Sequence, residues 1–224
     1  MYGLVGFEIL ELWDAGEGRP PWQQALLLAA RAVDQSPLAE AARLEVGERD
    51  RLILGLRERT LARPLEMVLP CPSCAEPVEF AFATADLCAD WAAPVRSPVE
   101  HTWKYGSFRA PATLDVAATQ SAEELFARCA PGAPPEAFAE WEAEIERLDP
   151  LADLVLELEC SLCGHKWDLP FDATAFFWKE LRANARRLIQ EVATLAARYG
   201  WSEDEILRLS PRRRQLYLDA GASA

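Results

Sequence analysis

The sequence predicts an α+β fold that is mainly helical, interrupted by two cysteine-knuckle hairpins and closed by a long C-terminal helix. Two C-x-x-C pairs, Cys71/Cys74 and Cys160/Cys163, are each flanked by alternating apolar and polar residues, the pattern of half-buried strands. The segments outside them have apolar residues at helical spacing. Half of the 224 residues are hydrophobic, which is sufficient for a packed core.

The N-terminal segment, residues 1–63, is predicted to be helical. Pro20 and Pro21 precede an apolar run, and proline suits the first turn of a helix. Ser36 followed by Pro37 is typical of an N-cap and a first helical position. A further helix is expected from Gly47, and its acidic start favours the positive end of the helix dipole.

Two predicted hairpins, 64–83 and 154–171, share the layout of strand, C-x-x-C knuckle and strand. Aligning Cys71 on Cys160 places apolar residues of the first hairpin on apolar residues of the second. Ribbons of this kind usually separate their pairs by about 15–20 residues, whereas 85 residues separate Cys74 from Cys160. We interpret segment 84–153 as an insertion between the two halves of one ribbon.

Four thiolates from two knuckles can surround one ion, and zinc prefers tetrahedral sulfur coordination. Gly164 after the second knuckle suits a turn with positive φ, but Ala75 stands at the equivalent place in the first. The sequence therefore predicts a split zinc ribbon with one structural zinc, and its expected ligands are Cys71, Cys74, Cys160 and Cys163.

Other uses of these cysteines fit less well. A thioredoxin-type pair opens a helix, disulfides are rare in a reducing compartment, and catalytic zinc keeps an open coordination position. His165, two residues after Cys163, is expected to be solvated, and His101 to lie on a polar strand face. Cys88 and Cys129 are expected to be small core residues.

The insertion 84–153 is predicted to be mixed α/β. Its expected elements are a short helix at 86–91, a strand at 99–108, a helix capped by Ser121 with Glu124, a linker-like turn at 130–135 and an amphipathic helix at 136–148.

The C-terminal segment, 172–224, carries the longest helical pattern, from an Asp172 cap to a Gly200 stop. Its apolar stripe suits either the protein's own core or a partner helix. Capped helices are expected after Ser202 and Ser210. We predict a partner-binding surface on this segment, formed by Phe177, Leu181, Leu188, Val192 and Trp201.

The formal net charge is −13. This acidity argues against binding to duplex DNA and to anionic membranes, both of which attract clustered Lys and Arg. No apolar run approaches the roughly 18 residues of a spanning helix, and the start lacks the features of a secretory signal. A cytoplasmic location is expected. No P-loop, G-x-S-x-G or H-E-x-x-H motif is present, so no enzymatic activity is expected.

Several stretches together resemble one protein family. They are 47–50 (GERD), 54–57 (LGLR), 71–74 (CPSC), 108–115 (FRAPATLD), 149–150 (DP), 160–164 (CSLCG), 176–181 (FFWKEL), 191–192 (EV), 195–196 (LA), 199–207 (YGWSEDEIL), 213–214 (RR) and 217–218 (YL). With them the chain resembles the T-even-type phage baseplate hub assembly chaperones, which have relatives in phage-tail-like contractile injection systems. The stretches span nearly the whole chain, and none is a catalytic motif.

The resemblance implies a non-enzymatic assembly factor whose partners are hub and spike proteins of a contractile-tail baseplate. A second hypothesis is a zinc-ribbon protein that binds nucleic acid or acts in transcription. Such modules usually carry basic and aromatic residues around the knuckles, whereas these knuckles are flanked by glutamates.

Overall fold

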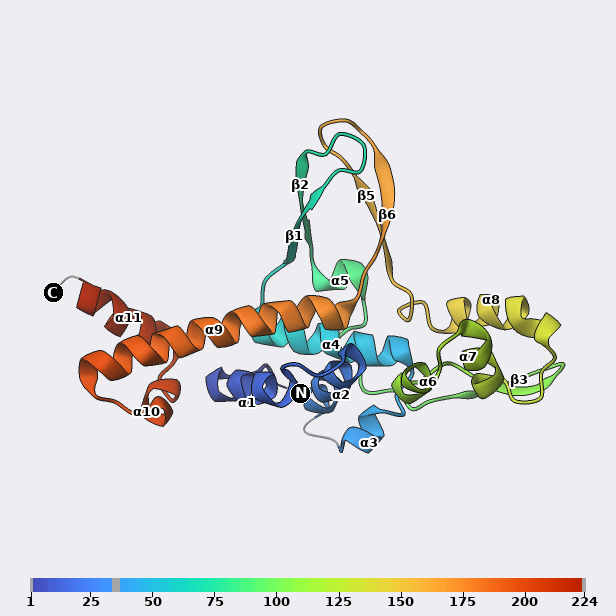
Figure 1. Ribbon diagram of the computed structural model, residues 1–224, viewed down its shortest axis with the longest axis horizontal. Helices are drawn as coiled ribbons and strands as arrows, with labels where there is room; N and C mark the ends of the chain where they lie inside the picture. The colour runs from blue at the N-terminus through green and yellow to red at the C-terminus, as the bar shows by residue number, and fades with distance from the viewer. Residues whose placement is uncertain (1, 34–36, 223–224) are drawn as a thin grey trace.

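The computed structural model describes residues 2–33 and 37–222 and confirms a mainly helical α+β architecture. Figure 1 shows three parts: an elongated helical body, an arm of β-strands that rises from its middle, and a lobe at one end. The body contains the helices within residues 6–61 and 173–222, the arm contains the strands within 65–82 and 155–170, and the lobe contains the strands and helices within 100–148. No helix in the described part of the chain has the length and apolarity needed to cross a bilayer.

The N-terminal half of the body is helical, as predicted. It consists of α1 (Gly6–Gly16), α2 (Pro21–Ala32), α3 (Leu38–Ala41) and α4 (Val46–Leu61). Proline occupies the first turn of α2, and α4 begins one residue before the expected Gly47. Ser36, predicted to cap a helix, lies outside the described residues.

The C-terminal half of the body is built on the predicted long helix. It consists of α9 (Ala173–Tyr199), α10 (Glu203–Leu207) and α11 (Pro211–Ala222). The Asp172 carboxylate accepts a hydrogen bond from the Ala175 amide at 2.9 Å, and Gly200 ends α9 with φ of 69°. Because α9 packs on α1, α2 and α4, this C-terminal helix and the N-terminal helices share one core.

Two largely buried ion pairs join α9 to two of its neighbours, one before it in the sequence and one after it. The fully buried Arg57 of α4 donates to both Glu180 oxygens, at 2.7 and 2.8 Å. Arg214 of α11, which is 5% exposed, donates to Glu191 at 2.9 Å. A buried charge is tolerated when it is paired and hydrogen-bonded, so these two glutamates of α9 are held toward the inside.

The insertion differs in detail from its prediction. It contains α5 (Thr84–Leu87), β3 (Glu100–Trp103), β4 (Gly106–Arg109), α6 (Thr113–Ala118), α7 (Ala122–Cys129), a 3-10 turn (Pro135–Ala137) and α8 (Phe138–Leu148). The expected single strand at 99–108 is a hairpin, because Gly106, with φ of 115°, lets the chain reverse. The helix expected at 86–91 is shorter and lies earlier, at Thr84–Leu87, because the Asp86 carboxylate accepts a hydrogen bond from the Ala83 amide and so caps the helix at its start.

A separate apolar cluster fills the lobe. Phe126 and Trp141 lie on α7 and α8 with ring centroids 5.4 Å apart, and Phe108 of β4 is buried with them. Ala130, in the turn expected to be a linker, is buried in the same cluster. The hydroxyl of Ser121 accepts from the Glu124 amide at 3.2 Å, but the Glu124 carboxylate accepts from Gln120, so the capping box is half formed.

The arm consists of two antiparallel hairpins that remain separate sheets. Their strands are β1 (Leu65–Pro70), β2 (Pro77–Phe82), β5 (Val155–Glu159) and β6 (Lys166–Pro170). Leu69 pairs with Val78, and Leu158 pairs with Trp167 at the equivalent place. This common register confirms the internal repeat. In Figure 1 the hairpins form the two sides of an arch that closes at the top.

Candidate metal centre

The four cysteines predicted as ligands meet where the two hairpins close the arch. The Sγ atoms of Cys71 and Cys163 are 3.7 Å apart, and those of Cys74 and Cys160 are 3.8 Å apart. All four sulfur atoms lie within 4.8 Å of one another. A disulfide needs sulfur atoms about 2.05 Å apart, and all four cysteines are free thiols.

These spacings match a metal site. Four sulfur ligands about 2.3 Å from a central zinc form a tetrahedron with edges of about 3.8 Å. The two crosswise pairs, Cys71 with Cys163 and Cys74 with Cys160, are already at that distance. The four cysteines can therefore hold one metal ion, with two ligands from each hairpin.

The two knuckles have the same backbone conformation. The Cys71 amide donates to the Glu76 carbonyl at 2.9 Å, and the Cys160 amide donates to the His165 carbonyl at 2.8 Å. Gly164 turns the second knuckle with φ of 71°, as expected, and Ala75 turns the first with φ of 61°. The apparent mismatch at Ala75 is therefore a left-handed alanine, which costs about 1–2 kcal/mol relative to an ordinary conformation.

The thiols of the cluster lie close enough to affect one another's pKa. Burial raises the pKa of Cys71, but hydrogen bonds from the knuckle amides and the neighbouring thiols lower it to about 7. The Glu76 amide lowers the pKa of Cys74, but burial and the other three thiols raise it to about 12. Cys71 thus loses its proton readily, whereas ionisation of Cys74 is disfavoured by burial and by the neighbouring thiols. A bound metal ion would favour the thiolate form of both.

The cluster is enclosed on one side. Cys71 and Cys160 are buried, with Val78 buried beside them, whereas Cys74 and Cys163 are exposed. Phe80 meets Trp167 edge to face across the two hairpins, with ring centroids 5.7 Å apart. A site with four protein thiolates leaves no open position for a substrate.

The remaining cysteines and both histidines lie outside the cluster. Cys88 and Cys129 are buried, and burial raises the pKa of each to about 11. His165 is exposed and stacks on Trp167, while His101 stacks on Phe108 in the lobe. Within the described residues, the four-cysteine cluster is the one group of three or more candidate metal ligands.

The predicted partner-binding surface is wrong for three of its five residues. Phe177, Leu181 and Leu188 are at most 3% exposed, because this stripe of α9 faces α1, α2 and α4. Val192 packs partly against the same core. Trp201 is half-buried in a cluster with two tyrosines of α9 and α11.

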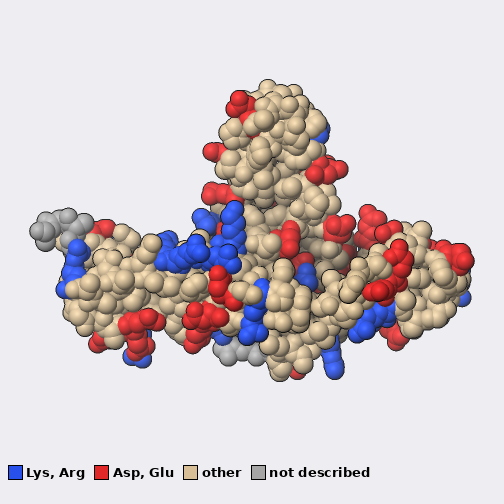
Figure 2. Space-filling view, viewed as in Figure 1, with Lys and Arg blue, Asp and Glu red and all other residues tan. Residues whose placement is uncertain are grey.

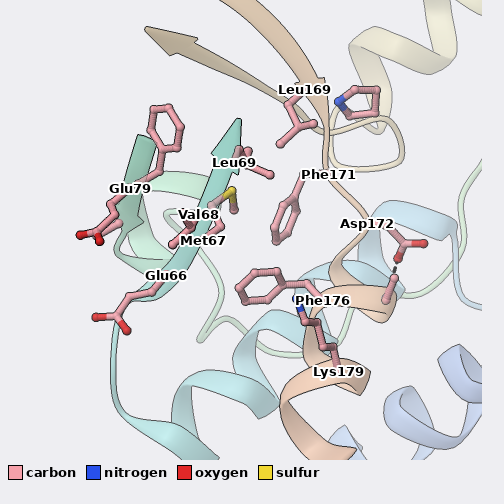
Figure 3. Close-up of a pocket in the computed structure, with 14 residues that line it drawn as sticks. Glu66, Met67, Val68, Leu69, Glu79, Leu169, Phe171, Asp172, Phe176 and Lys179 are labelled. Atoms are coloured by element: carbon pink, nitrogen blue, oxygen red, sulfur yellow. Dashed lines mark hydrogen bonds between the residues drawn. The ribbon is translucent and has the colours of Figure 1, made fainter. Parts of the chain in front are cut away.

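A groove beneath the four-cysteine cluster was not predicted. It has a volume of about 1020 Å³ and lies between the hairpins and the start of α9. Figure 3 shows Met67 and Leu69 of β1 facing Leu169, Phe171 and Phe176 across this space. Alternation of apolar residues in the hairpins is visible in the sequence, but the separation of the hairpins below their tips is not.

Comparison of the chain with models of known protein families, with curated proteins and with solved structures finds no match.

Proposed function

We propose that the chain is a non-enzymatic assembly factor for the baseplate hub of a contractile phage tail or phage-tail-like injection system, in which one zinc ion is structural. It would act in the cytoplasm and bind hub or spike proteins. The observation that carries the structural-metal part of the proposal is the four-cysteine cluster at the top of the arch. Its two cysteine pairs are separated by 85 residues of sequence and belong to hairpins that form separate sheets.

Zinc is the metal that fits this donor set best. Four thiolates in a tetrahedron are typical of structural zinc, although iron also accepts such ligands. With every position filled by cysteine, the metal would hold the hairpins together and polarise no substrate. The binding free energy of such sites, about 10 kcal/mol or more, is folding free energy.

Support for the baseplate role comes from the resembling stretches, which contact one another in this fold. The Gly47 amide of GERD donates to the Asp149 carboxylate of the DP stretch at 2.9 Å. Arg57 of LGLR binds Glu180 of FFWKEL, and Glu191 of EV binds Arg214 of RR. The residues that carry the resemblance are therefore ones that this architecture uses to fasten its parts together.

The surroundings of the knuckles favour this proposal over a nucleic-acid-binding ribbon. The exposed residues on the four strands include the glutamates Glu66, Glu79, Glu157 and Glu159, with Lys166 as the only basic residue of those strands. Phosphate recognition requires the opposite charge.

The test is co-purification of the tagged chain from its native cells, run beside purified finished particles. We expect hub and spike proteins in the soluble fraction with the chain and one zinc per chain by elemental analysis. The Cys160→Ser variant should lose the metal, whereas Cys88→Ala should retain it.

Two results would contradict the proposal. Recovery of nucleic acid or polymerase without any tail protein would favour the ribbon alternative. A chain with iron in place of zinc would contradict the assignment of the metal and leave the assembly role to be decided by the recovered proteins.

A further inference from the structure

The solvent face of α9 is basic on a strongly acidic protein. The helix contains five basic and two acidic residues, whereas the whole chain has a net charge of −13. Both acidic residues point inward: Glu180 binds Arg57, and Glu191 binds Arg214. The outward face of the helix is therefore left with basic side chains.

Two of these basic side chains are free to bind a ligand. Lys179 and Arg186 are exposed and form no ion pair with any described residue. They lie seven residues apart, which places them about 10 Å apart along one side of the helix. Figure 2 shows Lys and Arg side chains gathered along α9 beside the foot of the arm.

This basic row leads directly into the apolar groove under the arch. Lys179 forms part of the groove wall, and Figure 3 places it at the edge of the space, next to Phe176. Phe176 also contacts Phe171, with ring centroids 5.3 Å apart. The apolar side chains that line the groove are half-buried and still accessible: Met67, Leu69, Phe80, Leu169, Phe171 and Phe176.

We propose that the groove and the basic face of α9 together bind one extended acidic segment of a partner protein. Apolar side chains of the segment occupy the groove, and its carboxylates meet Lys179 and Arg186. An extended chain advances about 3.3 Å per residue, so the two carboxylates are expected about three residues apart. Charge complementarity of this kind guides the encounter and fixes the register.

A protein segment fits the groove better than a nucleic acid does. The groove wall also includes Glu66, Glu79 and Asp172. A segment with apolar side chains in the groove and its carboxylates outside, at Lys179 and Arg186, avoids them, whereas the continuous phosphates of a nucleic acid do not. A volume of about 1020 Å³ lies at the upper end of the usual range for ligand pockets, about 300–1,000 Å³, and accommodates several side chains. The inference holds for any acidic partner and is independent of the baseplate assignment.

The test uses a displayed library of random 12-residue peptides, selected on the full-length, zinc-loaded chain. We expect enrichment of peptides that combine two or more apolar residues with Asp or Glu three residues apart. A synthetic copy of the most enriched peptide is then titrated by fluorescence anisotropy. The double variant Lys179→Glu/Arg186→Glu should weaken its binding by at least roughly tenfold.

A matched control is available on α11. Arg212 and Arg213 are also exposed, so Arg212→Glu/Arg213→Glu makes the same change in net charge away from the groove. This control should leave the affinity within about twofold, and the Met67→Ser variant should weaken binding by removing an apolar wall. Circular dichroism and zinc content establish that each variant is folded.

The proposal is overturned if no peptide is enriched, or if the enriched peptides are neutral or basic. It is also overturned if both charge-reversal variants weaken binding equally, because the effect is then one of net charge. A single-stranded dT oligonucleotide that binds more tightly than the peptide and competes with it would assign the surface to nucleic acid instead.

Discussion

Removing the metal is predicted to release the arm while the helical body stays folded. Without the metal, the apolar contacts at the tip come from Val78, Phe80 and Trp167 together with the thiols. The one aromatic pair between the hairpins contributes about 0.5–1.5 kcal/mol, and an isolated two-stranded hairpin is marginally stable in water. The body has its own core, so it does not depend on this contact.

The expected loss of protection in the arm follows from the free energies of metal binding and of the aromatic contact. With the metal bound, opening the arm must overcome a binding free energy of about 10 kcal/mol or more. After chelation, about 1 kcal/mol remains, which protects an amide from exchange by roughly five- to tenfold. Protection in the strands of the arm should therefore fall by several orders of magnitude, and protection in α2, α4 and α9 should change little.

Hydrogen exchange followed by mass spectrometry measures both regions in one experiment. The metal-loaded protein is compared with the chelated protein and with Cys160→Ser, and Cys88→Ala serves as the control that keeps its metal. The reasoning is refuted if a chain shown to be metal-free retains protection in β1, β2, β5 and β6. Equal loss of protection in α4 and α9 would also refute it, because the body would then depend on the arm.

Three further predictions concern the stability of the fold. Ala75→Gly should raise the free energy of unfolding by about 1 kcal/mol, because it removes an alanine from the left-handed conformation, and Gly164→Ala should lower it by a similar amount. Urea denaturation of the metal-loaded protein measures both changes, and changes of the same sign would contradict the prediction. Gly47→Ala should cost about 1–3 kcal/mol, because its Cβ would lie 1.9 Å from an oxygen of Asp149; an unchanged urea midpoint would count against this. Burial raises the pKa of Asp115, but two arginines and a backbone amide lower it to about 2. The ionised carboxylate therefore stabilises the fold fully above the pKa of about 3.8 that it has in the unfolded chain, and this stabilisation is lost as the pH falls toward 2. Asp115→Asn should flatten the rise of the free energy of unfolding between pH 2 and 4, and an identical slope would refute this.

The four-cysteine cluster was the most predictable part of the molecule. The repeated C-x-x-C knuckles and their alternating flanks indicated that these four cysteines would meet, and their sulfur atoms lie within 4.8 Å of one another. The ends of α9 were equally visible, because Asp172 and Gly200 are local signals that act within one turn of the helix. Both predictions depend on residues close together in the sequence.

The predictions that failed required knowledge of which helix face packs on which other element of the fold. The stripe that includes Phe177 and Leu181 has the same spacing whether it faces a partner or the protein's own α4, so periodicity alone could not decide. The inward pairing of Glu180 and Glu191 joins distant helices, and no local pattern reveals it. The basic face of α9 was hidden for the same reason, because an acidic total masks a local excess of arginine and lysine.

The packing of α9 on the N-terminal helices also sets the order in which a nascent chain can fold. Between the end of α4 at Leu61 and the end of α9 at Tyr199 lie 137 residues. At about 5–20 residues per second their synthesis takes on the order of ten seconds. During that time the faces of α2 and α4 that pack on α9 in the finished protein have no cover from it. A chain that ends before α9 is therefore expected to expose part of the apolar core.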